Sequence, residues 1–162
     1  MSATQIAPIG PHPSADVLLV GALLWSDPDA AVDVLRLVHD DDLADPPTAA
    51  VLAAVRSRAD TGRPLGPQLV LDELRRIGQL RGSVPDRLRD ATTCGAVAEQ
   101  ARDLAAAVVA DSLRRRVESA GHALTTAAGM AAEADLAPMV AAAAAAVSDC
   151  AHRLQLLRGD CL

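Results

Sequence analysis

Ser14-Ala-Asp-Val-Leu-Leu-Val-Gly-Ala-Leu-Leu-Trp25 is the stretch of sequence that decides the fold. Ser14 is a good N-cap, and Asp16 suits the first turn of a helix, where a carboxylate meets the positive end of the helix dipole. Residues 17–25 are apolar without a break, and a helix without a polar face belongs inside a protein. These nine residues are too few to span a bilayer, and no Arg precedes them to form the basic start of a secretory signal. The stretch therefore predicts the buried central helix of a helical domain.

The composition also favours helices over sheets. Phe and Tyr are absent, and Trp25 is the only aromatic residue among 162. A core built from Leu, Val and Ala suits closely packed helices, whereas a pleated sheet favours β-branched and aromatic side chains. We expect an all-α fold, with a small multi-helix head followed by a long antiparallel helical hairpin. The residues expected in the core of the head are Val17, Leu18, Leu19, Leu23, Leu24, Val51, Leu52 and Leu74.

Charge and residue usage exclude several functions. All 15 basic residues are Arg, and a phosphate-binding P-loop requires a Lys that reaches the phosphates. The net charge of -6 argues against broad nucleic-acid binding, which requires a basic face. No His lies near a Cys or Ser in a recognisable nucleophile motif. We therefore expect a protein that is not an enzyme and that has no catalytic residues and no cofactor.

The potential metal ligands are dispersed. The three cysteines, Cys94, Cys150 and Cys161, form no C-x-x-C pair, which suits free thiols in a reducing cytoplasm and predicts no metal site. The acidic run 40–42 is interpreted as a solvated helix end, because three successive carboxylates point in diverging directions. We expect a cytoplasmic protein that does not associate with a membrane.

Breakers and periodicity divide the chain into four parts. Residues 1–13 hold three Pro and one Gly and predict a flexible arm, and residues 159–162 form a tail. The helical head spans 14–95 and the helical hairpin spans 96–158. Two helices of the head are expected to begin at Pro28 and Pro67, and two more to span 47–59 and 84–91. In the helix 47–59, Arg56 and Arg58 are expected to face water.

The hairpin is predicted from two Ala-rich segments. An apolar stripe runs through 96–128, and a second helix is expected over 135–157, where Pro138 is tolerated because it lies in the first turn. Two long helices joined by a short turn lie antiparallel, and Ala lets their backbones approach closely. The run 141–146 consists of Ala alone, whose high helix propensity argues against disorder.

Several of these segments, taken in order, resemble the N-terminal domain of DnaB-type replicative helicases. The similarity covers residues 13–157, and the order and spacing of the segments carry it, because each one alone is an ordinary helix or turn. The matching segments are Asp16-Val-Leu-Leu-Val-Gly-Ala-Leu-Leu24, Leu43-Ala-Asp-Pro46, Gly62-Arg-Pro64, Leu74-Arg-Arg-Ile-Gly-Gln-Leu80 and Leu113-Arg-Arg-Arg-Val117. The chain departs from the family at Ala44 and around Arg87-Leu88, where the family has aromatic residues.

The resemblance implies a function in protein contact. In that family the domain does no chemistry: it forms a collar, pairs through its hairpin and offers a surface to the primase. We therefore expect a primosome-type interaction module of DNA replication that binds primase or the replicative helicase and forms a homodimer through the hairpin, with nucleic-acid binding weak or absent. Two alternatives stay open. The chain could be a helical DNA-associated regulator with the same fold, or the N-terminal part of a replicative helicase whose ATPase domain is absent here.

The candidate partner-binding residues lie in the hairpin. They are Arg114, Arg115, Arg116, Val109, Leu113 and Leu156. Val109 and Leu156 lie off the seam between the two helices, so the head or a second subunit must cover them. The Arg cluster has two interpretations. It is either a solvated face paired with Asp111 and Glu118, each pair worth about 0.5 kcal/mol, or a docking site for an acidic surface or a phosphate.

Overall fold

Seven α-helices form almost all of the part of the chain that the structure describes. The computed structural model describes residues 13–159, in which there are also two short 3-10 helices and no strand, so the all-α prediction is confirmed. Apart from Pro13 and Gly159, the predicted arm 1–13 and tail 159–162 lie outside the described residues. The elements are α1 Ala15–Leu24, α2 Pro28–Leu35, η1 Asp40–Asp42, α3 Pro46–Ala59, α4 Pro67–Arg76, α5 Val84–Thr93, η2 Ala98–Gln100, α6 Ala101–Met130 and α7 Glu133–Arg158.

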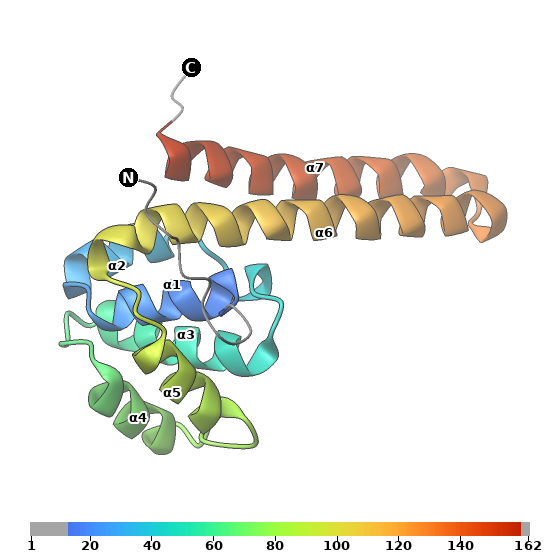
Figure 1. Cartoon of the computed structure of the whole chain (residues 1–162). Coiled ribbons are helices and arrows are strands. Elements are labelled where there is room, and N and C mark those ends of the chain that lie inside the picture. Colours follow the sequence, from blue (N-terminus) through green and yellow to red (C-terminus); the bar gives the residue numbers. More distant parts are fainter. Residues whose placement is uncertain (1–12, 160–162) are drawn as a thin grey trace, which may run out of the picture.

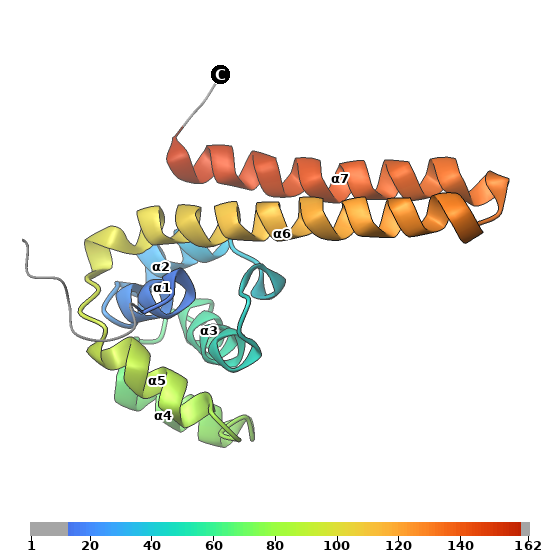
Figure 2. The same cartoon turned by 45° about the vertical axis from the view of Figure 1, so that its right-hand side comes forward.

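The helices are arranged as a head and an arm. Helices α1 to α5 form the head, and α6 crosses one side of it before continuing into solvent (Figure 1). Helix α7 returns antiparallel along α6, on the side away from the head (Figures 1 and 2). Near the head, α6 is therefore packed on two sides, whereas in the outer half of the hairpin α6 and α7 pack only on each other among the described residues.

Helix α1 is the centre of the head. The hydroxyl of Ser14 accepts a hydrogen bond from the N–H of Val17 at 3.4 Å, and the carboxylate of Asp16 accepts one from the N–H of Ala44 at 2.9 Å. All the expected core residues are buried except Leu18, which is half-buried against the same core. Trp25 was expected to continue the buried run, and this was wrong. It is the C-cap of α1 and 56% of it is exposed.

A glycine in α1 allows α5 to come close. An added Cβ at Gly21 would lie 2.6 Å from the carbonyl oxygen of Ala91 and against the sulfur of Cys94. Because the nearest obstacle on one side is backbone, a larger residue forces the two helices apart. The end of α5 is therefore held directly against the central helix.

Arg56 and Arg58 do not face water as expected. The guanidinium of Arg56 donates to the carbonyls of Leu35 and Val38 at 2.7 and 2.8 Å, so it closes the C-terminal end of α2. The buried Arg58 donates twice to the carbonyl of Pro64, at 2.9 and 2.8 Å. These side chains satisfy backbone carbonyls that a helix end and a loop leave without partners.

Two helix boundaries of the hairpin differ from the prediction. Helix α6 begins at Ala101 rather than at residue 96, because Gly95 has a φ of +77° and Val97 is extended. Helix α7 begins at Glu133 rather than at residue 135, and Pro138 therefore lies beyond the first turn. Its ring nitrogen has no hydrogen to donate within the helix, a local cost at an exposed position.

Two glycines should respond oppositely to the same substitution. Gly21→Ala is expected to destabilise the protein by about 1–3 kcal/mol, because the new methyl group overpacks the contact between α1 and α5. Gly121→Ala, in the exposed part of α6 with no atom beyond its own stretch of helix within 4 Å of the added Cβ, is the matched control and should stabilise by about 0.5–1 kcal/mol. Urea denaturation measures both. Equal effects of the two substitutions would contradict the close contact at Gly21.

Candidate functional site

A buried carboxylate joins the head to the arm. Asp42, at the end of η1, is completely buried. The guanidinium of Arg153 in α7 donates to both of its oxygens, with Nη2 3.2 Å from Oδ1, and the hydroxyl of Ser112 in α6 donates to Oδ1 at 2.7 Å. The backbone N–H of His39 donates to Oδ2 at 2.8 Å. One side chain of the head therefore holds both helices of the hairpin.

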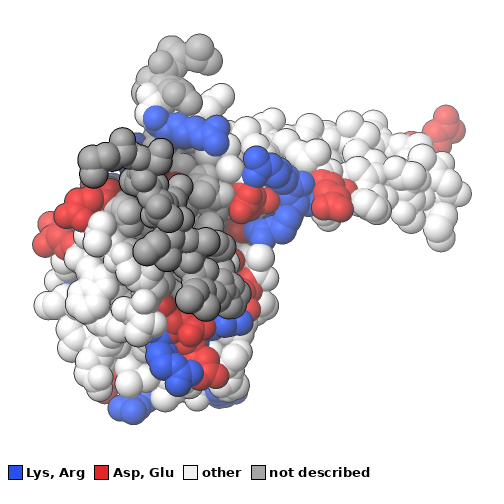
Figure 3. All heavy atoms as spheres, in the orientation of Figure 1, with Lys and Arg blue, Asp and Glu red and all other residues white. Residues whose placement is uncertain are grey.

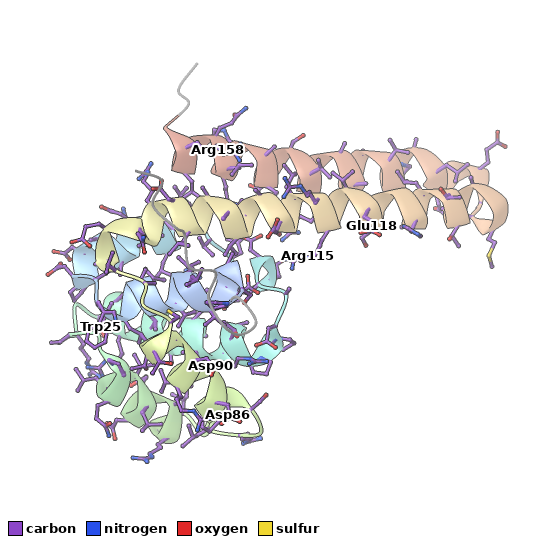
Figure 4. All side chains as sticks on the ribbon, in the orientation of Figure 1. Trp25, Asp86, Asp90, Arg115, Glu118 and Arg158 are labelled. Atoms are coloured by element: carbon purple, nitrogen blue, oxygen red, sulfur yellow. The ribbon has the colours of Figure 1, made fainter. Side chains whose placement is uncertain are left out.

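Further contacts surround this pair. Arg153 also donates to the carbonyl of Leu37 at 2.9 Å. Arg116 lies 2.8 Å from the carboxylate of Asp41 and 3.3 Å from that of Asp42. Arg115 donates to the backbone carbonyl of Asp42. Figure 4 labels Arg115 on α6, where this helix passes the head. Four cationic or hydroxyl groups of the hairpin thus converge on one short segment of the head.

The pKa of Asp42 reflects these contacts. Burial alone would raise the pKa of this carboxyl, but hydrogen bonds from Arg153, the His39 backbone and Ser112 outweigh it. The pKa falls from 3.8 to about 2. The carboxylate is therefore ionised at neutral pH, and its ionisation stabilises the folded state.

The interpretation of residues 40–42 as a solvated helix end is wrong for Asp42. Side-chain atoms of His39, Asp41 and Asp42 lie within 4.8 Å of one another, a spacing that a metal ion would also fit. Both oxygens of Asp42 already accept two or more hydrogen bonds from protein groups. The geometry is that of an ion-pair network joining two parts of the chain.

The structure divides the predicted Arg cluster. Arg114 pairs with Asp111 at 2.8 Å on an exposed face, as the solvated interpretation has it. Arg115 and Arg116 point to the head and bind residues 41–42 instead. The three side chains therefore do not form one docking surface, and Arg114 alone is fully exposed.

The apolar candidates are also divided. Val109 is completely buried and its carbonyl accepts a weak bond from the thiol of Cys150 at 3.6 Å, so its assignment to partner binding is corrected: packing within the chain covers it. Leu113 is half-buried against the core of the head. Leu156 is 37% exposed near the end of α7. Only Leu156 of these three offers a substantial surface to a partner.

The outer part of the arm presents a surface that sequence reasoning missed. From Val117 to Asp149, Ala127 is the only buried residue. The exposed large apolar side chains of this part are Val117, Met130 and Val140, at 51, 85 and 53%. On the face that Figure 3 shows, the outer arm is almost without charge except at its tip, whereas charges gather on the head and where the arm leaves it. The signal in the sequence was the Ala run 141–146, which places methyl groups on every side of a helix.

Helix α7 is also long and apolar. By length and composition alone it could cross a membrane. Its last turns, however, are built into the protein: Arg153, Leu154 and Leu157 are buried, and Arg102 of α6 donates to the carbonyls of Leu156 and Leu157. The uncovered apolar length is therefore the outer arm, residues 117–149.

Comparison with solved structures gives a match over nearly the whole chain. The structure is similar to the crystal structure of the N-terminal domain of DnaB helicase from Mycobacterium tuberculosis, with a TM-score of 0.70 and 28% sequence identity. The similarity covers 86% of this chain and 99% of that one. No protein-family model matches the sequence, and no curated protein matches it. The resemblance to the DnaB-type N-terminal domain is confirmed.

The network predicts a large and pH-dependent effect of Asp42→Asn. At neutral pH this substitution should destabilise by about 3–5 kcal/mol, because it leaves the buried guanidinium of Arg153 with only the exposed carboxylate of Asp149, 3.1 Å from its Nε, as a counter-charge. The pKa of Asp42 in the folded protein lies below the unfolded value of 3.8. The stabilisation that its ionised carboxylate gives the folded state is therefore complete above about pH 4 and is lost as the pH falls towards 2. The difference between the native chain and the variant should therefore shrink by about 2 kcal/mol over that range.

Chemical denaturation at several pH values measures this difference. Asp111→Asn is the matched control, because its carboxylate is exposed and pairs with Arg114 on one helix face. The control should cost about 0.5 kcal/mol or less. A cost for Asp42→Asn no greater than that of the control, or a cost independent of pH, would contradict a buried ion pair at this position.

Proposed function

With the fold of the DnaB helicase N-terminal domain as the premise, we propose that this chain is a non-catalytic interaction module of DNA replication. It pairs with a second copy through the outer arm and offers the resulting helical surface to primase or to the replicative helicase in the cytoplasm. The observation that carries the proposal is the match over 99% of an isolated helicase N-terminal domain, with head and hairpin both included.

The exposure of the outer arm supports pairing. Two helices packed only on each other bury one stripe each, and Ala contributes a single methyl group per position to that stripe. Most helical stability in proteins comes from packing of an apolar face rather than from helix propensity. Residues 117–149 have almost no buried side chains, so a partner that covers them supplies stabilisation that the chain by itself lacks.

The chemistry of the chain supports a non-catalytic role. It contains no Lys, and therefore no P-loop of the kind that drives nucleotide hydrolysis. The arginines that suggested phosphate binding, Arg115 and Arg116, bind the segment 41–42 of the head. These contacts occupy Arg115 and Arg116 within the chain, which weakens the alternative of DNA binding through this cluster.

Pairing through the outer arm predicts the effect of a charge placed there. Val140→Glu is expected to weaken self-association of the chain at least about tenfold, because pairing would desolvate a carboxylate in an apolar contact. Leu69→Glu is the matched control: Leu69 is 41% exposed in α4 of the head and should leave association unchanged. Sedimentation equilibrium measures the association, and circular dichroism checks that both variants stay helical.

The same samples test the partner. Purified primase and purified replicative helicase are each mixed with the native chain at low and high salt, and the mass of the complex is followed by light scattering. The proposal predicts a complex that survives high salt. A chain that stays monomeric at every concentration, or that binds neither protein but binds DNA with a strong salt dependence, would contradict it.

A further inference from the structure

The only aromatic side chain of the protein lies on the surface. Trp25 is the C-cap of α1, where its backbone N–H donates to the carbonyl of Ala22 at 3.2 Å. Of the residue, 56% is exposed. Figure 4 labels it at the end of the head away from the arm's tip. Trp25 lines a shallow hollow of about 450 Å³ together with Thr92 and Val97, and Val97 is itself 48% exposed. A single exposed apolar residue needs no explanation, but two in one hollow form a patch.

One acidic residue lines this patch, and two more follow Trp25 closely in the chain. Glu99 lines the same hollow, and Asp27 and Asp29 follow Trp25 closely in the chain at the start of α2. All three are exposed, and none has an ion-pair partner among residues 13–159. Arg36, at the end of α2, is paired with Asp33, and Arg102, three residues after Glu99, donates to the carbonyls at the end of α7 and not to Glu99. Glu99 beside the indole, and Asp27 and Asp29 just after it in the chain, are therefore carboxylates without a bound cationic side chain among the described residues.

We propose that the hollow at Trp25 docks a basic amphipathic helix of another protein. An apolar side chain of that helix would fill the space between Trp25 and Val97, and its Lys or Arg residues would face Glu99 and Asp27. Trp is enriched among the residues that dominate binding energy, and complementary charges at the rim give specificity and rapid association. The carboxylates and the ring together thus select the chemistry of the occupant.

The charges disfavour a second copy of this chain as the occupant. In a symmetric dimer the same patch meets itself, so Glu99 and Asp27 of one copy would lie opposite those of the other. Like charges brought together in a contact oppose association. The patch also lies on the head, apart from the outer arm, so it stays free when the arm is covered (Figures 1 and 4).

Trp25 supplies its own assay, because with Phe and Tyr absent the intrinsic fluorescence comes from this one residue. The probe is a short Trp-free helical peptide of Leu and Lys with one apolar face, and the control peptide has Glu in place of Lys. The Leu-Lys peptide should shift the emission to shorter wavelength, saturably and less at high salt, and should protect the ring from acrylamide quenching. The Leu-Glu peptide should do neither.

Variants locate the binding to the patch. Asp27→Asn combined with Glu99→Gln should weaken binding of the Leu-Lys peptide about tenfold, whereas Asp135→Asn combined with Glu133→Gln, two exposed acids at the tip of the arm, should have no effect. With a labelled peptide followed by anisotropy, Trp25→Ala should weaken binding about thirtyfold and Leu69→Ala not at all.

Three results would overturn the proposal. The first is no change in Trp25 emission with the Leu-Lys peptide, and the second is equal binding of both peptides or equal loss in the patch and arm-tip variants. The third is a shift of emission with concentration of the chain alone in the Val140→Glu background, which would make a second copy the occupant. None of these outcomes depends on primase or helicase binding, so the two proposals fail separately.

Discussion

The structure depends on the cost of burying one charge. The carboxylate of Asp42 lies out of water, and an unpaired charge there would be severely unfavourable. It is ionised because Arg153, Ser112 and the backbone of His39 all donate to it, and these groups come from α7, α6 and the head. The three elements must therefore be in place together, which fixes the direction in which the arm leaves the head.

Hydrogen bonds from arginine side chains to backbone carbonyls connect other parts of the molecule. Arg56 and Arg58 donate to carbonyls within the head, and Arg102 donates to the last carbonyls of α7. The planar guanidinium offers several donors in a fixed arrangement, so one side chain can satisfy two carbonyls at a helix end. In a chain without Lys, and with aromatic packing reduced to one exposed Trp, these contacts hold helices together around a core of small aliphatic residues.

The parts of the fold that follow from local pattern were predictable. Local sequence patterns of a few residues predict the buried helix α1 from its apolar run, the ends of helices from the turn residues, and the hairpin from the long Ala-rich segments. Burial of Asp42 was not, because three successive acids are typical of a solvated turn and the groups that pair with Asp42 are 70 and 111 residues away. Exposure of Trp25 was missed for the opposite reason: its apolar neighbours predict burial, but the helix ends at Leu24. The exposed surface of the outer arm could not be predicted, because Ala occurs both in protein cores and on exposed helix faces.

In the function that we propose, a second copy covers the outer arm, residues 117–149, and stabilises it. Hydrogen exchange of individual amides at low and high protein concentration tests this most directly, since exchange reports local opening. Amides of the outer arm should be protected more strongly as the concentration rises, while those of α1 and α3 in the head should not change. Protection of the outer arm that is the same at every concentration would contradict it.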